Sequence, residues 1–460
     1  MTGLQRGALF PRSPNIARSF RQLPVIRVDL ASQLPVYLRG LVLLAAGAVL
    51  IPGVQAQTQP RGAAPHVARQ AGKLVLNRPV ARELGPGQTD VFTLNVLAGL
   101  FLHVEAEKKG VDMEVVLADP EGKPLVTADS PNGAFGPVPA SLIAGRGGEY
   151  RIRVAKSPRS AETGRYRIEL TDLHAPTEQD RTRLRAEAEF YAAVDGDRAQ
   201  DREKRLQAIA GYERAAGLWR SLRDDREVAL CLHRIGTIYD SLGESQKALD
   251  YHNQALPLRR AAGDGAGEAA TLNGIGNVYS HIGENQKAVD SYSQALTLRR
   301  ALGDRGGEAA TLGNIGVVYR NLGENRKALD AFKQVLPLMR AMGDRKGEAI
   351  TLNNMGGVYF DLGEKQKALE YFSRALPLNR AIGERLNEAG NLNNIGQCYA
   401  DLGDKRKFKM ASDSGLFASL IEARNNSQEI GTGMEAEREP AEVEEFNEAE
   451  EIDNSYQMQR

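Results

Sequence analysis

Hydrophobic residues between positions 187 and 407 follow a helical spacing that repeats every 40 residues. In one unit, apolar side chains fall three and four positions apart over 272–282 and again over 288–298, which predicts two amphipathic helices. Gly283-Glu284 separates the two helices, and Gly303-Asp304 ends the second helix and begins the next unit. Glycine suits the position after a helix and aspartate caps the helix that follows, so the unit is predicted to be a helical hairpin.

The same residue types return at equivalent places in successive units. Complete units begin near positions 225, 265, 305 and 345, a degenerate unit precedes them, and a further first helix is predicted from about Leu386 to Leu402. Because each hairpin can bury its apolar face only against its neighbours, the region is predicted to form one continuous stack. The recurring residues are Tyr239, Tyr279, Tyr319, Tyr359 and Tyr399, Gly236, Gly276, Gly316, Gly356 and Gly396, and Gly243, Gly283, Gly323, Gly363 and Gly403.

Between Gly72 and Asp172 the apolar positions instead alternate with polar ones, and this period of two predicts β-strands. Turn sequences such as 119–122 and 145–148 separate the alternating runs. Several short strands over about 100 residues are typical of a β-sandwich. The chain is therefore predicted to be multidomain, with an all-β sandwich over 72–172 followed by an all-α solenoid over 180–407. The alternating runs are 91–96, 100–104, 113–117, 150–154 and 166–170.

Small and aromatic residues in each hairpin carry a family resemblance. Gly276 and Ala288 lie where the two helices are expected to cross closely, Tyr279 and Tyr292 are expected to anchor the packing, and Ala295 is expected between neighbouring hairpins. In these residues the units resemble the tetratricopeptide family, and the 40-residue period resembles the variant found in kinesin light chains and in adaptor proteins with asparagine-bearing first helices. The resemblance implies a right-handed superhelical solenoid, with first helices lining a concave groove that binds a protein or a peptide.

Amide side chains recur on the first helices at positions that avoid the packing face. A carboxamide offers two donors and an acceptor without a charge, so a row of them can hydrogen-bond the main chain of an extended peptide, as the resemblance to the adaptors implies. The alternative is that these asparagines tune turns or contacts between repeats, although asparagine is a poor helix former. The candidate groove residues, with Arg320 and Phe360 expected to contact peptide side chains, are Asn277, His281, Asn314, Arg320, Asn321, Asn354, Phe360, Asp361, Asn394 and Gln397.

The strand-rich segment has a looser resemblance of its own. Its motifs at 110–117, 119–122, 148–152 and 164–168 resemble the bacterial pre-peptidase C-terminal domain, a small sandwich that accompanies secreted enzymes. The resemblance implies an accessory role in adhesion or positioning.

Charged residues in this segment have a structural interpretation. Asp112, Asp119, Glu121 and Asp129 lack the regular alternation and the closing glutamate of a calcium loop, so they are predicted to be turn and edge-strand carboxylates. Lys108-Lys109 is expected to protect an edge strand from aggregation.

Charge and cysteine content narrow the chemistry of the whole chain. Lysine plus arginine equals aspartate plus glutamate at 59 each, so no basic field favours nucleic acid. Cys231 and Cys398 lie far apart inside predicted helices, which excludes a disulfide framework and a zinc cluster and favours two buried thiols. The lysines that recur on second helices are expected to form a solvated convex face: Lys247, Lys287, Lys327 and Lys367.

The N-terminus carries features of an export signal. An arginine-rich leader precedes an apolar run from Gly40 to Ile51, and 54–56 offers small residues to a signal peptidase. Twelve apolar residues reach only about 18 Å as a helix, short of a hydrocarbon core of about 30 Å, which favours cleavage after Ala56 over a membrane anchor. We therefore expect a periplasmic or secreted protein, attached to a membrane only if the segment stays uncleaved, with a linker over 57–71.

The repeat pattern breaks at Phe408, where a second helix should begin. Residues 408–434 are predicted to be a capping segment, in which 415–424 has the pattern of a short amphipathic helix. The stretch from Glu435 to Asp453 holds ten carboxylates and one arginine, so residues 435–460 are predicted to be a disordered acidic tail.

The order of these segments resembles the front half of bacterial proteins that end in a caspase-like domain. That domain needs a histidine and cysteine dyad beyond the repeats, but His281 is the last histidine and Cys398 lies on a repeat helix. Phosphate-loop, metalloprotease and nucleophile-elbow motifs are missing from the sequence as well. We therefore expect a non-catalytic scaffold without cofactor or metal. The alternatives are a truncated regulatory remnant of a caspase-like peptidase and a cell-envelope attachment protein whose sandwich binds polysaccharide.

Overall fold

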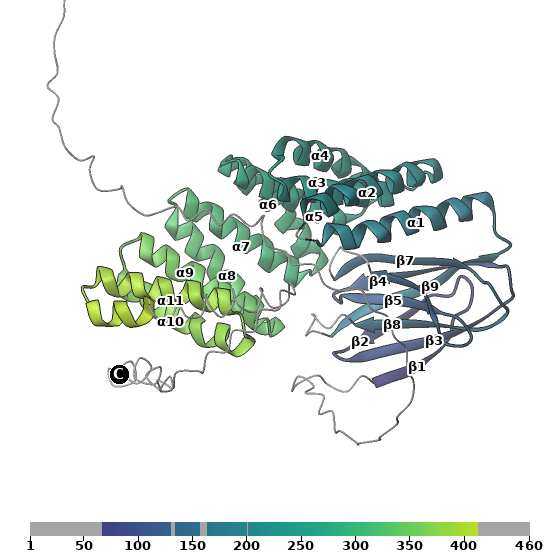
Figure 1. Cartoon of the computed structure of the whole chain (residues 1–460), viewed down its shortest axis with the longest axis horizontal. Coiled ribbons are helices and arrows are strands. Elements are labelled where there is room, and N and C mark those ends of the chain that lie inside the picture. Colours follow the sequence, from purple (N-terminus) through teal and green to yellow (C-terminus); the bar gives the residue numbers. More distant parts are fainter. Residues whose placement is uncertain (1–66, 130–133, 157–162, 200, 413–460) are drawn as a thin grey trace, which may run out of the picture. The chain divides into compact units, whose positions relative to one another are not determined.

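A computed structural model describes residues 67–129, 134–156, 163–199 and 201–412, which form a β-sandwich followed by stacked helices (Figure 1). The predicted signal segment, residues 57–66 of the predicted linker, the 415–424 helix and the acidic tail lie outside the described residues. Within the described part, no helix is both long and apolar enough to span a membrane.

Two sheets pack face to face in the sandwich. The first sheet has the strand order β1-β3-β8-β5-β6, with β1 at Val67–Lys73, β3 at Gln88–Val96, β8 at Gly148–Lys156, β5 at Met113–Ala118 and β6 at Pro124–Asp129. The second has the order β2-β9-β4-β7, with β2 at Val80–Leu84, β9 at Gly164–His174, β4 at Phe101–Lys109 and β7 at Phe135–Ile143. Neighbours are antiparallel except β1 and β3. Inward residues of both sheets form one apolar core.

The alternating sequence pattern predicts the inner strands and misses the outer ones. The five predicted runs lie in β3, β4, β5, β8 and β9. The four strands that the pattern does not predict, β1, β2, β6 and β7, are the sheet edges. In β7 the buried Val138, Ala140 and Leu142 do alternate, but Pro137 and Pro139 interrupt the strand-forming composition, which is tolerated at an edge.

The expectation that Lys108-Lys109 marks an edge strand is wrong. Both residues lie on β4, which pairs with β9 on one side and β7 on the other. Lys108 is 1% exposed and its Nζ lies 3.5 Å from Asp112 Oδ1, while burial lowers the pKa of its ammonium. Asp119, in contrast, has the predicted turn role, since its carboxylate accepts the backbone N–H groups of Glu121 and Lys123 over 3.0 and 2.9 Å.

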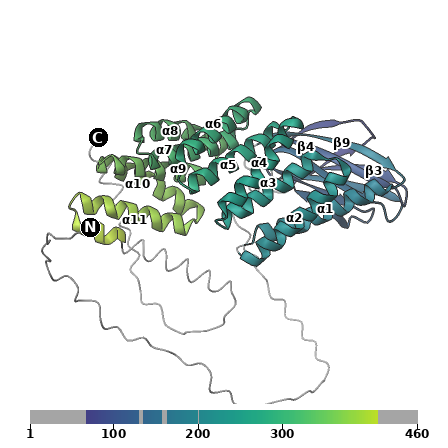
Figure 2. The same ribbon diagram turned by 90° about the horizontal axis from the view of Figure 1, so that it is seen from above.

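The helices form hairpins that stack in chain order (Figure 2). In each hairpin of the array the first helix has an odd number and the second an even one. Their bounds are α1 Glu178–Asp197, α2 Arg202–Leu222, α3 Asp225–Ser241, α4 Ser245–Ala261, α5 Gly265–His281, α6 Asn285–Leu302, α7 Arg305–Asn321, α8 Asn325–Met342, α9 Arg345–Asp361, α10 Lys365–Ile382 and α11 Arg385–Asp401. Residues 405–412 are also helical and pack against α11.

The predicted boundaries between units are confirmed by the helix caps. Gly303 ends α6 in the left-handed conformation, with φ of 68°, and Asp304 accepts the N–H of Gly307 over 2.9 Å at the start of α7. Asp304 also forms an ion pair with Arg299, which lies on the preceding helix. One short segment therefore ends one helix, begins the next and pairs a partly buried arginine.

Each first helix crosses its partner helix at a glycine. A Cβ added to Gly276 would lie 2.6 Å from the Tyr292 ring, and one added to Gly316 would lie 2.6 Å from the Phe332 ring. Because the ring occupies the space of the missing side chain, the glycine permits a closer approach of the two helices. Ala288, which the sequence places at the same crossing, is fully buried.

The recurring lysines of the second helices are exposed, as expected, but each has partners. Lys327 Nζ lies 5.1 Å from the centroid of the Tyr319 ring and 2.5 Å from Glu324 Oε2. The same pair of contacts recurs at Lys247, Lys287 and Lys367. These lysines therefore join the two helices of a hairpin in addition to facing solvent.

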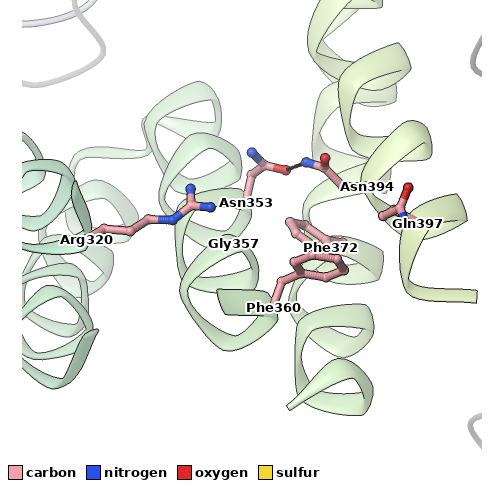
Figure 3. A pocket seen from close by; sticks show the side chains of 7 residues that line it. All are labelled: Arg320, Asn353, Gly357, Phe360, Phe372, Asn394 and Gln397. Atoms are coloured by element: carbon pink, nitrogen blue, oxygen red, sulfur yellow. Dashed lines mark hydrogen bonds between the residues drawn. The ribbon is translucent and has the colours of Figure 1, made fainter. Parts of the chain in front are cut away.

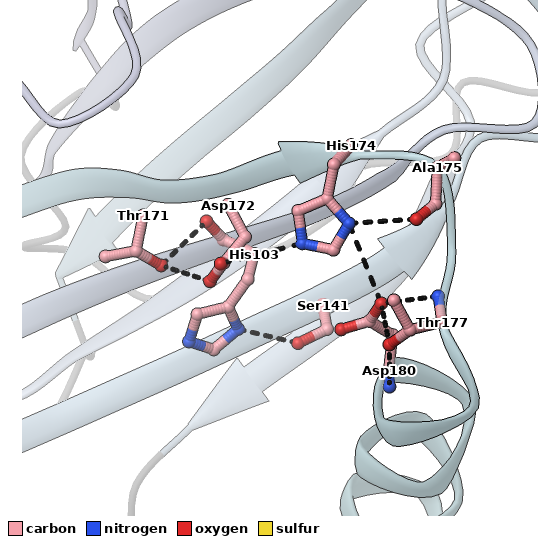
Figure 4. A network of polar contacts seen from close by, with 8 residues as sticks. All are labelled: His103, Ser141, Thr171, Asp172, His174, Ala175, Thr177 and Asp180. Carbon is pink, nitrogen blue, oxygen red and sulfur yellow. Dashed lines mark hydrogen bonds and ion pairs between the residues drawn. The ribbon is translucent and has the colours of Figure 1, made fainter.

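A buried polar chain connects the sandwich with α1. The Oγ of Ser141 on β7 lies 2.7 Å from Nδ1 of His103 on β4 (Figure 4), and it donates to the carboxylate of Glu187 on α1 over 2.7 Å. The Ser141 N–H donates to the same carboxylate over 3.2 Å, and the Tyr191 hydroxyl donates to the Pro139 carbonyl over 3.0 Å. Burial raises the pKa of Glu187 to about 7 and lowers the pKa of His103 to about 4.

Candidate functional site

A pocket of about 130 Å³ lies where α7, α9 and α11 follow one another in the stack (Figure 3). The first helices supply most of its lining, and one ring comes from α10. Its lining residues are Arg320, Asn353, Gly357, Phe360, Phe372, Asn394 and Gln397. Four of the candidate groove residues, Arg320, Phe360, Asn394 and Gln397, are therefore brought together in one place.

Asn353 is the centre of the polar lining. Its Oδ1 accepts the Nδ2 groups of Asn391 and Asn394 over 2.9 and 3.1 Å, so the oxygen is occupied by two donors from the next first helix. Its own Nδ2 and the Oδ1 of Asn394 have no hydrogen-bond partner among the residues that the structure describes. The pair therefore presents one amide donor and one amide acceptor for a ligand.

Gln397 adds a second acceptor on the side of α11. Its Nε2 donates to Asp401 Oδ1 over 3.1 Å, which leaves its Oε1 without a partner within the described ranges. Asp401 also pairs with Lys365 over 3.0 Å, and hydrogen bonds from Lys365 and Gln397 lower the pKa of the Asp401 carboxyl. The negative charge of Asp401 beside the pocket is thus compensated by Lys365.

Arg320 lies at the opposite side of the pocket from Gln397 (Figure 3). Its Nε donates to Asp361 Oδ2 over 2.5 Å and its Nη2 to Asp361 Oδ1 over 3.3 Å, so an ion pair joins α7 with α9. The guanidinium passes over Gly357, where a Cβ would lie 2.6 Å from Arg320 Nη1. Glycine at this position makes room for the arginine, whereas α7 and α11 have Val317 and Gln397 at the equivalent place.

Two aromatic rings complete the lining. Phe360 extends from α9 and Phe372 from α10, and the two rings lie close together in the pocket (Figure 3). Lys365 Nζ lies 3.1 Å from the centroid of the Phe360 ring. The pocket therefore combines neutral amides, aromatic faces and charges that are each paired.

Asn277 and Asn314 lie outside this pocket in a second group of amides. Asn314 Nδ2 donates to Asn273 Oδ1 and to Asn277 Oδ1, each over 3.3 Å, and the Tyr292 hydroxyl donates to Asn277 Oδ1 over 2.7 Å. These contacts join α5 with α7. At these two positions the asparagines form contacts between repeats, which is the alternative that the sequence left open.

The remaining candidates on the first helices do not line the pocket. His281 Nδ1 lies 2.9 Å from Asp240 Oδ1, so this pair joins α3 with α5. Asn321 is exposed and Asn354 is half-buried, and neither has a hydrogen-bond partner in the described part of the chain. Between α7 and α9 the row of linked amides is interrupted, because α7 has Gly313 where α5 and α9 have Asn273 and Asn353.

Sequence reasoning missed Asn353, Gly357 and Phe372. A signal for Asn353 was present, because Asn273, Asn353 and Asn393 occupy the same place in three of the 40-residue units, one place before the chosen row. Gly357 occupies the same repeat position as the candidates Asn277 and Gln397, but its role depends on Arg320, and Phe372 offered no signal because its place depends on the packing of α10. Neither cysteine takes part, because both thiols are free and buried, and burial raises the pKa of Cys398 to about 11.

Comparison with known proteins agrees with this repeat architecture. The sequence model described as "Tetratricopeptide repeat" matches residues 199–261, 267–341 and 347–407, and repeats of this family are generally non-catalytic. No match was found among curated proteins.

Several solved structures are similar to the chain at low sequence identity. BtubC (BKLC) from P. vanneervenii is 17% identical, with 56% of this chain and 97% of that chain covered and a TM-score of 0.43. Aspartyl phosphate phosphatase F from Bacillus subtilis is 14% identical, with coverages of 57% and 76% and a TM-score of 0.43. The apo form of the quorum sensor NprR from B. thuringiensis is 20% identical, with coverages of 55% and 69% and a TM-score of 0.44.

Proposed function

Because residues 199–407 are tetratricopeptide repeats, we propose that this protein is a non-catalytic scaffold that holds an extended segment of a partner protein against its first helices. The observation that carries the proposal is the pocket formed across α7, α9 and α11. Its amide groups that lack partners in the described chain can bind a polypeptide, and its aromatic rings can pack against a side chain.

The affinity is expected to arise from several repeats together. A hydrogen bond exchanged with water contributes only about 1 kcal/mol net, so a single amide cannot hold a peptide. An extended segment that passes α7, α9 and α11 in turn meets Arg320, Asn353 and Asn394. The repeated geometry of the stack supplies this succession of contacts.

The test is selection of binding peptides from random peptides displayed on phage, with the full chain as bait. We expect the selected peptides to lose binding to a triple variant of the pocket, Asn353→Ala, Asn394→Ala and Gln397→Ala. The matched control is the triple variant Gln254→Ala, Gln294→Ala and Gln334→Ala, which removes three exposed amides from second helices. Circular dichroism would show that both variants are folded. Peptides that bind the pocket variant as well as the natural chain would refute the proposal.

We also propose that the protein is exported from the cytoplasm, with its N-terminal segment cleaved after Ala56. The support is the short apolar run 40–51 behind an arginine-rich leader, followed by small residues at 54 and 56. N-terminal sequencing of the mature protein should then begin at Gln57. A product that keeps residues 1–56 and stays in the membrane fraction would instead show an uncleaved anchor.

A further inference from the structure

The hydrogen-bonding groups in the pocket are arranged asymmetrically. On the side of α9, Asn353 presents its Nδ2, because its Oδ1 is occupied by Asn391 and Asn394. On the side of α11, Asn394 and Gln397 present oxygens, because their amide nitrogens donate to Asn353 and to Asp401. The pocket lining therefore offers one amide donor, from Asn353, and two acceptor oxygens, from Asn394 and Gln397.

The ligand group that matches this arrangement has an acceptor oxygen beside a nitrogen with two N–H groups. A main-chain amide has only one donor, its N–H, and a hydroxyl also has only one, its O–H. An ammonium has three donors, but it has no acceptor atom for the Nδ2 of Asn353. A side-chain carboxamide has one carbonyl oxygen and two N–H groups on the neighbouring nitrogen, so its donors and acceptor match the three free groups in number and kind.

The charge of the lining selects against the acidic isosteres. The Arg320 guanidinium is paired with Asp361 and the Lys365 ammonium with Asp401, so neither cation is left without a counterion. On the side of α11, a carboxylate would place its second oxygen against the acceptor oxygens of Asn394 and Gln397, whereas the Nη1 of Arg320 lies over Gly357 on the opposite side of the pocket. Sites that are built to pair a donor discriminate strongly against analogues that lack it.

The half-buried Phe360 ring fits the rest of such a side chain. It lies below the amides in Figure 3 and can contact the methylene groups of the ligand, whereas Phe372 is 2% exposed and offers little surface. The volume of about 130 Å³ suits one side chain, and it is too small for a folded element of a partner.

We propose that this pocket is a specificity pocket for a glutamine or asparagine side chain of the bound segment. The inference rests on the proposed function, since it assigns the side chain that the first helices recognise in an extended peptide. It makes Asn394 and Gln397 the residues that distinguish a carboxamide from a carboxylate.

The first experiment measures binding of two small probes to the full chain by ligand-observed NMR. N-acetyl-glutamine N-methylamide should bind at least about tenfold more tightly than N-acetyl-glutamate N-methylamide, a difference of about 1.4 kcal/mol. Gln397→Leu and Asn394→Leu should each remove this preference, because each deletes an acceptor. The control Gln294→Ala removes an exposed amide from α6, which does not line the pocket, and should leave the preference unchanged.

Equal binding of the two probes, or a preference that survives Gln397→Leu, would overturn the assignment. Sequencing of the phage-selected peptides separates this inference from the proposed function. Peptides that depend on the pocket yet show no enrichment of glutamine or asparagine at any position would leave the scaffold role standing and refute the carboxamide pocket. Discrimination between the probes without any selectable peptide would support the pocket and refute the scaffold role.

Discussion

Glycines on the same first helix differ in what surrounds them. In α7, a Cβ on Gly316 would lie 2.6 Å from the Phe332 ring, whereas a Cβ on Gly313 would meet nothing within 4 Å. Both residues have helical backbone, so the difference is one of packing rather than of conformation. The recurring glycine of the repeat is thus required by its aromatic neighbour.

Gly316→Ala is therefore expected to destabilise the array, because the added methyl forces the two helices of the hairpin apart. Overpacking of this kind costs about 1–3 kcal/mol. Gly313→Ala is the matched control, and it should stabilise the same helix by up to about 1 kcal/mol because alanine is the better helix former. Thermal unfolding followed by circular dichroism compares the two variants. The interpretation fails if the Gly316→Ala midpoint lies at or above that of the natural chain.

The hydrogen bonds between the amides show which part of the site could not be predicted from the sequence. The sequence predicted which helix positions carry exposed amides, because that depends only on period and composition. It could not predict that Asn277 and Asn314 bond to each other across repeats while Asn394 turns its oxygen to a pocket. Asn314 and Asn394 both meet an asparagine in the preceding first helix, and the difference depends on the residue one turn further along that helix, which is Asn277 in α5 and Gly357 in α9.

At the scale of helices, the connections between hairpins differ from one repeat to the next. Asp304 caps α7 and also pairs with Arg299 on α6, and Asp264 has the same two roles with Arg259. Asp344 caps α9 in the same way, but Met339 stands where the arginine would be. The repeats thus contain their own comparison between a cap alone and a cap with a partly buried ion pair.

We expect Asp304→Ala to destabilise the array more than Asp344→Ala. Loss of a cap costs about 1 kcal/mol, whereas removal of one partner from a buried ion pair adds about 3 kcal/mol or more, because the other charge is left without compensation. Arg299 is 14% exposed, so this second contribution applies only in part, but it should still separate the two variants. Chemical denaturation measures both. Equal losses for the two variants would show that the ion pair contributes nothing beyond the cap.

Elements are predicted from sequence to different degrees for a physical reason. The helical repeats were predicted with their starting residues, because each hairpin is packed on both sides and its apolar pattern is complete. The inner strands of the sandwich were predicted for the same reason. The four edge strands were missed because an edge has one neighbour and tolerates proline and exposed positions, as Pro137 and Pro139 of β7 illustrate.

For the molecule as a whole, the buried carboxyl of Glu187 links stability to pH. It lies between Ser141 of the sandwich and the repeat helices, where Arg183, Asp224 and Glu227 are charged neighbours. Burial raises its pKa from 4.5 to about 7, so the folded state binds a proton more tightly than the unfolded state. The stability that protonation gives is present in full below about pH 4.5 and is lost as the pH rises through 7.

Ionisation of Glu187 should therefore destabilise the natural chain by about 3 kcal/mol at pH 8 relative to pH 5, while the lowered pKa of His103 acts in the opposite direction. Glu187→Gln keeps the shape and can still accept from Ser141, but it cannot ionise. We expect the variant to be the more stable protein at pH 8 and to differ little from the natural chain at pH 5. Unfolding midpoints of both proteins at the two pH values test this. A variant that keeps the full pH dependence would exclude Glu187 as its source.

The interrupted row of amides has a mechanical consequence for the stack. Linked carboxamides join α5 to α7 and α9 to α11, but α7 has Gly313 at the corresponding place, and α7 and α9 are joined further along the helices by the ion pair of Arg320 and Asp361. Salt screens a half-exposed ion pair far more than it affects neutral amide bonds. Bending is thus expected to be easier at this joint than at the joints on either side, which linked amides hold, and to grow with ionic strength. A change in salt could then widen the binding surface at α7 and α9, and release what it holds, while every helix stays intact.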